Sequence, residues 1–172
     1  MTTLYTEMAS PLGTLLLTAQ DGALTGVHFP GQKHDRPRQP DWQRADGDPV
    51  LAQARAELGE YFAGRRTRFD VRLDPRGTPF QRAVWQALLA VPFGATSTYG
   101  AIAQAVRRPS AVRAVGAAVG ANPIGIVVPC HRIIGHDGTL TGYAGGLDRK
   151  AKLLEFEDRA AKLELTPQAH PR

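Results

Sequence analysis

Residues 111–132, AVRAVGAAVGANPIGIVVPCHR, decide how this chain folds and which atoms can react. Small and apolar side chains recur at helical spacing over 111–119, directly after Ser110, a favourable N-cap residue. The apolar run 124–128 predicts a buried strand that stops at Pro129, which has no amide hydrogen for a ladder. We therefore expect a helix, then a strand, with the thiol of Cys130 where that strand ends.

A second short helix is predicted before the first. Residues 99–106 have helical spacing, and a four-residue break at 107–110 separates them from 111–119, which is typical of a helix-turn-helix. Glycine and alanine are too short to read base edges in a wide major groove, so this surface suits close approach to a minor groove. Arg113 is the only long side chain there. The alternative is a small-residue helix packed inside the core.

Cys130 is the only cysteine of the 172 residues, so an intramolecular disulfide, a thiolate-rich zinc site and an iron–sulfur cluster are all excluded. A thiol becomes a nucleophile when a base or a cation lowers its pKa, and His131 and Arg132 are the adjacent candidates. Neighbours on an extended backbone point to opposite faces, so His131 reaches the sulfur only through a turn or a bridging water. The alternative is an inert, buried cysteine.

Upstream of this region the pattern predicts a small α/β part. Residues 4–29 read as three short antiparallel strands, and 50–62 as a helix packed on them. Residues 67–73 alternate as a further strand. Residues 74–79, DPRGTP, break every period and predict a boundary. The fold class is α/β, and we divide the chain into an N-terminal α/β domain (1–74), a linker (75–79), a mostly helical C-terminal domain (80–158) and a mobile tail (159–172).

The rest of the C-terminal part has three features. A turn at 135–138 is expected to join two short strands, 132–134 and 139–141. The glycine-rich loop 142–146 leaves backbone that a planar ligand could approach, although turn geometry alone also explains its glycines. A final helix over 148–158 is predicted with Leu147, Ala151, Leu153 and Leu154 facing inward; Glu157 either points inward to orient a histidine or belongs to a solvated acidic end.

The charge is unevenly distributed. Lys and Arg number 21 against 16 Asp and Glu, a net charge of +5. Residues 75–172 hold twelve of the basic and six of the acidic side chains. This excess favours contact with a polyanion, with nucleic acid preferred to an acidic membrane surface. The alternative is a basic surface that is merely solvated.

The chain has no secretory signal pattern and no run of 18 apolar residues, so we expect a cytoplasmic protein. Its five histidines show no metal-site spacing, and no metal is expected.

These motifs together resemble the O6-alkylguanine-DNA alkyltransferase family, the methylated-DNA–protein-cysteine methyltransferases. Pro129-Cys130-His131-Arg132 is similar to the active-site signature of the family. The supporting pieces occur in family order: Thr98-Tyr99, Arg113-Ala-Val-Gly116, Asn122-Pro123, Gly142-Tyr143 with Gly145-Gly146, and Glu157. The resemblance covers nearly the whole chain and is densest from Phe80 to Glu157.

The resemblance implies a repair protein that binds alkylated double-stranded DNA from the minor groove and flips the damaged guanine outward. Cys130 would take the alkyl group irreversibly, once per molecule, with His131 activating it through a water and Glu157 orienting the imidazole. The other implied roles are a proton donor (Tyr99), an arginine entering the base stack (Arg113), small residues facing DNA (Ala114, Gly116, Ala117), a brace for the active-site turn (Asn122) and pocket walls (Val128, Tyr143, Ala144, Gly145).

The family also implies a scaffolding N-terminal domain, no cofactor, no membrane partner, a monomer in solution, and O4-alkylthymine as a further candidate substrate. Some relatives hold zinc in the N-terminal domain through cysteines and histidines, and this chain has no cysteine there. Ala144 stands where some relatives carry a hydroxyl residue. Three rival functions remain: a non-catalytic protein that only recognises alkylated DNA, whose representatives lack the cysteine; a Cys–His hydrolase; and a transcriptional DNA binder.

Overall fold

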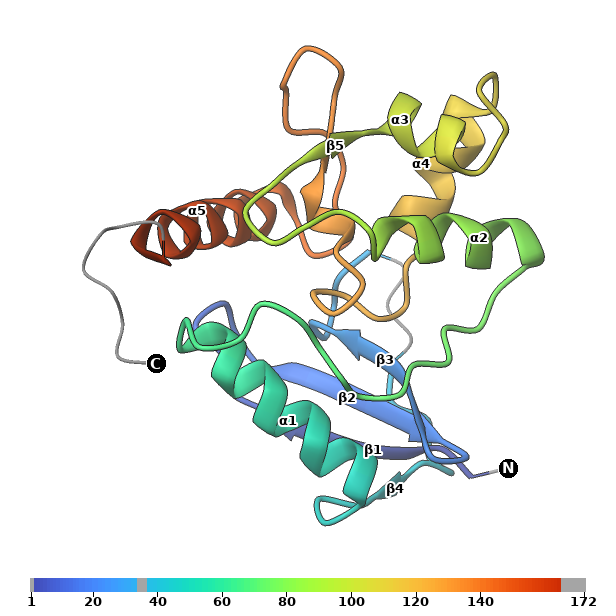
Figure 1. Cartoon of the computed structure of the whole chain (residues 1–172). Coiled ribbons are helices and arrows are strands. Elements are labelled where there is room, and N and C mark those ends of the chain that lie inside the picture. The colour runs from blue at the N-terminus through green and yellow to red at the C-terminus, as the bar shows by residue number, and fades with distance from the viewer. Residues whose placement is uncertain (1, 34–36, 165–172) are drawn as a thin grey trace.

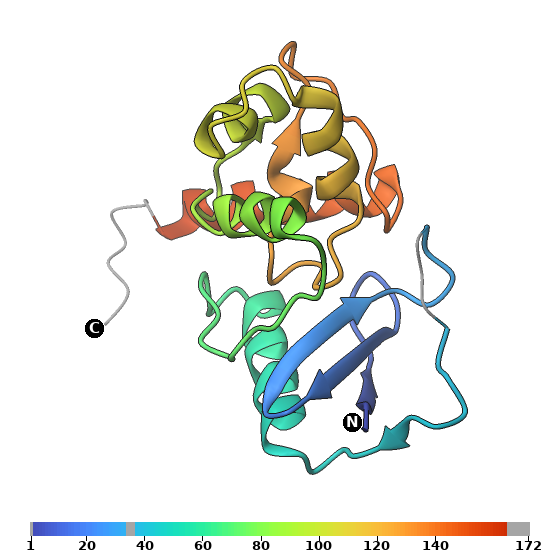
Figure 2. The same ribbon diagram turned by 90° about the vertical axis from the view of Figure 1, so that its right-hand side faces the viewer.

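The computed structural model describes residues 2–33 and 37–164 as a sheet with one helix, joined to a group of helices (Figures 1 and 2). Strands β1 (Leu4–Met8), β2 (Leu15–Gln20) and β3 (Ala23–His28) pair antiparallel, and the short β4 (Gln43–Arg44) pairs parallel with β1, in the order β3-β2-β1-β4. Asp21 and Gly22 join β2 to β3 with φ of 52° and 75°, as a two-residue hairpin turn requires. The predicted meander is confirmed.

Helix α1 (Pro49–Phe62) lies across one face of this sheet (Figure 1). It begins where the carboxylate of Asp48 accepts hydrogen bonds from the amides of Val50 and Leu51, both at 3.1 Å. Leu51, Ala54, Leu58 and Tyr61 form its buried stripe. The predicted helix is therefore confirmed, and it begins one residue earlier than expected.

The C-terminal part contains α2 (Pro79–Leu88), α3 (Tyr99–Ala105), α4 (Val112–Gly120) and α5 (Leu147–Glu164). The first three pack against one another, and α3 and α4 lie at the end of the molecule away from the sheet (Figures 1 and 2). The capping box of Thr78 and Gln81 starts α2. The pair of short helices predicted around 107–110 is confirmed within one residue at each end.

Three predicted strands are wrong, and two of them lie at 67–73 and 139–141. Residues 67–73 make only an isolated bridge, between Leu73 and Leu24. The buried carboxylate of Glu57 explains this, because it accepts the amide hydrogens of Asp70 (2.9 Å) and Val71 (3.1 Å) that a ladder would need. Residues 139–141 are not a strand either; β6 (Ile133–Ile134) pairs parallel with β5 (Ser97–Thr98) instead.

The apolar run 124–128 is also not a strand. It forms tight turns: the amide of Val127 donates to the carbonyl of Gly125 at 2.7 Å across Ile126, whose φ is 69°. The amide of Cys130 donates to the carbonyl of Val128 at 2.8 Å across Pro129, an inverse γ-turn with φ −82° and ψ 62°. The apolar composition of this run reflects burial, which strands and buried turns share.

This turn segment also joins the two parts of the molecule. The amide of Val27 in β3 donates to the carbonyl of Pro123 at 3.0 Å, and the amide of Gly125 donates back to Val27 at 2.9 Å. A Cβ at Gly125 would lie 3.1 Å from the Val27 carbonyl oxygen, so the absence of a side chain permits this close approach. The edge of the N-terminal sheet therefore supports the loop that precedes Cys130.

Helix α5 differs from its prediction at both ends. It continues to Glu164, so residues 159–164, expected in a mobile tail, are helical, and residues 165–172 lie outside the described part of the chain. Two (i, i+4) ion pairs, Arg159–Glu155 and Lys162–Asp158, stabilise these last turns. Its buried residues are Lys150, Leu153 and Glu157, whereas Leu147 is half exposed. Among the described residues no helix is long and apolar enough to cross a membrane.

Candidate active site around Cys130

Cys130 begins the short 3-10 helix η1 (Cys130–Arg132), and its side chain is buried. The side-chain nitrogen of Asn122 lies 3.1 Å from its sulfur and also donates to the carbonyl of Val128 at 2.8 Å. The side-chain oxygen of Asn122 accepts from the amide of Ile124 at 3.0 Å. A single amide group thus fixes both ends of the turn segment and contacts the reactive atom.

His131 follows Cys130 and is completely buried. Its Nε2 lies 2.7 Å from Oε2 of Glu157, and its Nδ1 has no hydrogen-bond partner among the residues that the structure describes. An ionised carboxylate can only accept hydrogen bonds, so Nε2 carries the proton and Nδ1 presents a lone pair. The imidazole is therefore oriented as a base, with a lone pair on the buried Nδ1 that is not bonded to the sulfur.

Glu157 is held as an anion. The guanidinium of Arg132 donates to both carboxylate oxygens, from Nε at 2.8 Å and from Nη2 at 3.0 Å. The hydroxyl of Tyr61 donates to Oε2 at 2.6 Å. Burial alone would raise the pKa of Glu157, but the hydrogen bonds and charges of His131 and Arg132 outweigh it and lower the pKa to about 2. The carboxylate is therefore ionised at neutral pH.

The two reacting groups are both neutral at rest. Burial raises the pKa of the Cys130 thiol, and the hydrogen bond from Asn122 and the charge of Lys150 act in the opposite direction without reversing it. Burial lowers the pKa of His131, against the opposing effect of Glu157. The thiol is consequently protonated near pH 7, and a neutral imidazole is available to receive its proton.

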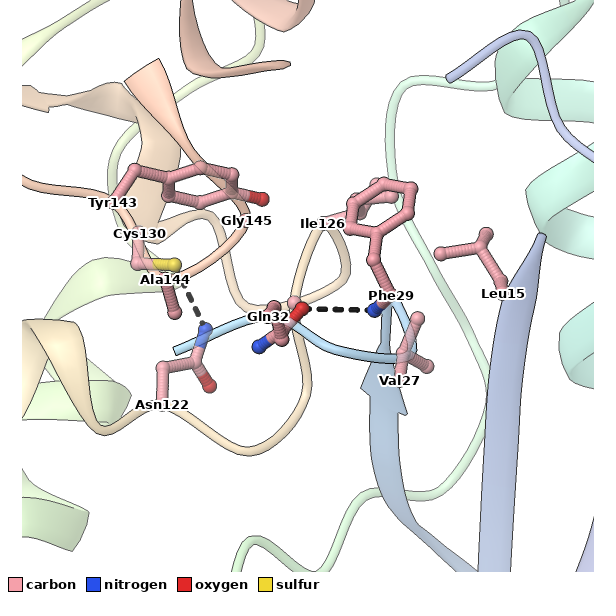
Figure 3. A pocket seen from close by; sticks show the side chains of 11 residues that line it. Leu15, Val27, Phe29, Gln32, Asn122, Ile126, Cys130, Tyr143, Ala144 and Gly145 are labelled. Atoms are coloured by element: carbon pink, nitrogen blue, oxygen red, sulfur yellow. Dashed lines mark hydrogen bonds between the residues drawn. The ribbon is translucent and has the colours of Figure 1, made fainter. Parts of the chain in front are cut away.

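A small cavity lies beside the sulfur of Cys130 (Figure 3). Tyr143, Ala144 and Gly145 form one wall, and Val27, Phe29 and Gln32 of the N-terminal part lie opposite. The cavity offers about 10 Å³ to the centre of a water-sized sphere, which is room for about one water molecule. Val128, expected in the wall, is buried elsewhere and contributes its carbonyl oxygen to Asn122.

The predicted DNA-facing residues lie on a different surface. On α4, Arg113, Ala114 and Ala117 are exposed, while Val115, Ala118 and Val119 are buried. Gly116 is half-buried against the ring of Tyr99, where an added Cβ would lie 3.8 Å away. The phenol oxygen of Tyr99 accepts a hydrogen bond from Thr141 at 2.9 Å. Neither Tyr99 nor Arg113 lines the cavity beside Cys130.

Three functional side chains were missed or given another role. Arg132 was considered only as a cation near the thiol, whereas it binds Glu157. Tyr61 falls within the helix predicted over 50–62, where its ring fits the apolar helical spacing. Lys150 is fully buried and donates to the carbonyls of Ile133 and Thr141, the latter at 2.6 Å, and burial lowers its pKa to about 8. Its spacing of three and seven residues before Leu153 and Glu157 could have identified it.

Comparison with known proteins decides the family. Residues 79–159 match the profile described as "6-O-methylguanine DNA methyltransferase, DNA binding domain", and residues 3–75 match "6-O-methylguanine DNA methyltransferase, ribonuclease-like domain". The chain belongs to the 6-O-methylguanine DNA methyltransferase family. The resemblance drawn from the motifs around Cys130 is confirmed.

Relatives of this methyltransferase match over almost their full length. A methylated-DNA–protein-cysteine methyltransferase of Mycolicibacterium paratuberculosis is 48% identical over 94% of this chain and 96% of its own, and that of Haemophilus influenzae is 45% identical over 89% and 85%. The crystal structure of Mycobacterium tuberculosis O6-methylguanine methyltransferase superposes with a TM-score of 0.84, at 46% identity over 92% of this chain and 94% of that one. M. tuberculosis OGT in complex with DNA gives 0.83, at 46% identity over 91% and 94%.

The donor set offers little to a metal ion. Within residues 2–33 and 37–164, no three or more His, Cys, Asp or Glu side chains are grouped so that they could hold one. The acidic and imidazole groups nearest Cys130 are already bonded to each other and to Arg132.

Proposed function

We propose that this protein repairs O6-alkylguanine in DNA by moving the alkyl group to the sulfur of Cys130. The S–C bond forms as the bond between the alkyl carbon and O6 breaks, and the electron pair of that bond leaves with guanine. A thioether has no good leaving group, so each molecule reacts once. The observation that carries the proposal is the buried Cys130, followed directly by a histidine whose orientation Glu157 fixes.

The thiol proton leaves through His131. Its Nδ1 is the acceptor, and a water in the small cavity region relays the proton from the sulfur. Glu157 stabilises the imidazolium that forms, and hydrogen bonds donated by Arg132 hold the Glu157 carboxylate in place. Asn122 donates to the developing thiolate, a bond that strengthens as charge appears on sulfur.

The substrate must enter as a flipped nucleotide. Cys130 is only 5% exposed, so an atom within a stacked duplex cannot reach its sulfur. The cavity has room for about one water, so the loop carrying Tyr143 and Gly145 has to move when a base enters. Tyr99, at the start of α3, donates a proton to the departing guanine.

The α3–α4 pair faces the DNA. The exposed Arg113 occupies the space that the flipped base leaves, and the small residues Ala114, Gly116 and Ala117 allow the helix to approach the minor groove. M. tuberculosis OGT, a relative of this protein, has been solved in complex with DNA, which supports DNA as the partner proposed here. We place the protein in the cytoplasm as a monomer that needs no cofactor.

The test is the intact mass of the protein after incubation with excess duplex carrying one O6-methylguanine. We expect a gain of one methylene, about 14 Da, and no more than one per chain. Peptide mapping should place it on Cys130, and Cys130→Ser should bind the duplex without gaining mass. Unchanged wild-type protein that still binds the lesion would instead indicate a recognition protein.

A further inference from the structure

The hydroxyl of Tyr61 joins the N-terminal part to the candidate site. Tyr61 lies near the end of α1, and its phenol donates to Oε2 of Glu157 on α5 at 2.6 Å, across 96 positions of sequence. Both side chains are almost completely buried, at 0% and 1% exposure. This is the same carboxylate oxygen that bonds Nε2 of His131.

The ring of Tyr61 is fixed by aromatic neighbours from both parts of the chain. Phe62, Phe69, Phe93 and Phe156 have ring centroids 5.1, 5.7, 6.0 and 5.4 Å from it. Three of these contacts are edge-on. The hydroxyl therefore has one direction available, toward Glu157, and an aliphatic residue at this position would fill the core without making that bond.

A structural explanation alone accounts poorly for this hydroxyl. Filling an aromatic cluster needs only the ring, and a buried phenol has to find an acceptor. The acceptor it finds is the group that sets the tautomer of His131. Burial and the adjacent carboxylate raise the pKa of Tyr61 well above its ordinary range, so it remains a donor throughout the working pH range.

We propose that Tyr61 is a positioning residue for alkyl transfer, through which the N-terminal part holds the Glu157 carboxylate in place against His131. The inference rests on the proposed function, since Glu157 matters here as the partner of the base. It gives the N-terminal part a role in the chemistry itself. Tyr61 does not touch the reacting atoms and acts only through Glu157.

Removal of the hydroxyl has a defined electrostatic consequence. Without it, Oε2 keeps only the bonds from His131 and Arg132, becomes more basic, and attracts the Nε2 proton of His131 more strongly. The imidazole then protonates at a higher pH, where it can no longer act as the base. The other titratable groups nearby, Lys150, Tyr143 and Cys130, are the same in both proteins.

The experiment compares full-length wild type with Tyr61→Phe, which keeps the ring. The single-turnover rate of methyl transfer from an O6-methylguanine duplex is measured from pH 5 to 9. We expect a rate lower by about 10- to 100-fold, corresponding to the loss of one hydrogen bond to a charged group. The acid limb of the pH profile should move to higher pH, while duplex affinity and the final gain of one methyl per chain stay the same.

The matched control is Phe62→Leu, which disturbs the same aromatic cluster but leaves the hydroxyl. It should lower the melting temperature without moving the acid limb. A second variant, Tyr61→3-fluorotyrosine, retains the hydroxyl as a stronger donor, so the limb should move to lower pH even if Tyr61→Phe does not fold. An acid limb that stays at the wild-type pH in every folded Tyr61 variant would overturn the proposal.

The outcome also separates this proposal from the proposed function. Wild-type protein that gains no methyl group refutes alkyl transfer itself. Wild-type protein that gains one methyl, beside a Tyr61→Phe protein with the same rate and pH profile, refutes only the role of Tyr61.

Discussion

The side-chain nitrogen of Asn122 lies 3.1 Å from the sulfur of Cys130, and the same nitrogen donates to the carbonyl of Val128 at 2.8 Å. The residue therefore combines two roles: it shapes the turn segment and it meets the charge that appears on sulfur. A neutral thiol is a weak acceptor, whereas a thiolate is a strong one. Asn122 consequently favours the reactive form over the resting form.

Asn122→Asp should remove the donor and keep the oxygen that accepts from the amide of Ile124. The new carboxylate is close in shape but accepts hydrogen bonds only, so it faces the sulfur and the Val128 carbonyl with like charge. We expect the thiol pKa to rise and the methyl-transfer rate at pH 7.5 to fall by about 100-fold. Stopped-flow transfer rates against pH measure both effects.

The control for this change is Gln32→Glu, which adds a negative charge to the opposite wall of the same cavity and can still accept from the amide of Phe29. It should slow transfer much less, because Gln32 does not bond the sulfur. Equal slowing by both variants would show that the total charge of the cavity matters and the hydrogen bond does not.

The elements predicted correctly are those specified by local signals. The turn at Asp21–Gly22 and the helical spacing of α1 each act within a few residues. The strand predicted at 67–73 failed because the carboxylate of Glu57, from α1, takes its amide hydrogens. The run 124–128 failed because apolar composition reports burial and does not distinguish a strand from buried turns.

The candidate site shows the same division. Cys130 and His131 are adjacent in the chain, so a motif identifies them, and Glu157 was reached through the family resemblance. Glu157 also accepts a hydrogen bond from Tyr61, 96 residues away, whose side chain fits an apolar helix face equally well. Lys150 was missed because a lysine on a charged helix ordinarily lies at the surface. The hydrogen bond between Tyr61 and Glu157 leaves no periodic signal in the sequence.

Acid should destabilise the protein through Glu157. Its pKa in the folded protein is about 2, below the ordinary 4.5, so its stabilising contribution is complete above pH 4.5 and is lost as the pH falls through 2. The buried His131 adds a separate loss below about pH 6.5, because its lowered pKa means that the unfolded chain binds the proton first. Both effects weaken the folded state in acid.

Glu157→Gln removes the first effect, and because it takes away the charge that raises the pKa of His131, it leaves the second effect in place and strengthens it. At pH 7 it should lower the free energy of unfolding by about 3 kcal/mol, since it leaves the buried Arg132 without its anion. The difference from wild type should shrink between pH 4.5 and 2, as measured by urea unfolding. Glu155→Gln, on the exposed side of the same helix, is the control and should stay within about 0.5 kcal/mol. A pH-independent difference would contradict the assignment.

Lys150→Met tests the buried ammonium beneath the pocket loop. The carbonyls of Ile133 and Thr141 lose their donor, which costs about 1–3 kcal/mol each, and relief from burying a charge offsets part of this. We expect a net loss of about 2 kcal/mol at pH 7. Lys152→Met, an exposed lysine of the same helix, should have almost no effect.

The pH dependence of this difference has a definite sign. Burial lowers the pKa of Lys150 from 10.5 to about 8, so between these values the unfolded chain holds a proton that the folded protein has released. The stability of wild type relative to Lys150→Met should therefore rise from pH 8 to 10.5, by up to about 3 kcal/mol. If the stability of wild type relative to Lys150→Met instead falls from pH 8 to 10.5, the carbonyl partners of Lys150 favour its charged form.

Arg113→Ala should distinguish DNA remodelling from the chemistry of transfer. Arg113 is exposed on α4 and lies outside the cavity beside Cys130, so its loss leaves the thiol, His131 and Glu157 unchanged. An arginine that fills the vacated base position compensates for unstacking, which costs a few kcal/mol. We expect methyl transfer from duplex to slow by about 10- to 100-fold, with transfer from the free base O6-methylguanine within about twofold of wild type.

Arg159→Ala removes an equal charge from an exposed site on α5 and should change neither rate. If the transfer rates from duplex and from free base fall equally, Arg113 acts through the stability of the fold. A role in the base stack would slow only the reaction with duplex, because the free base has no stack.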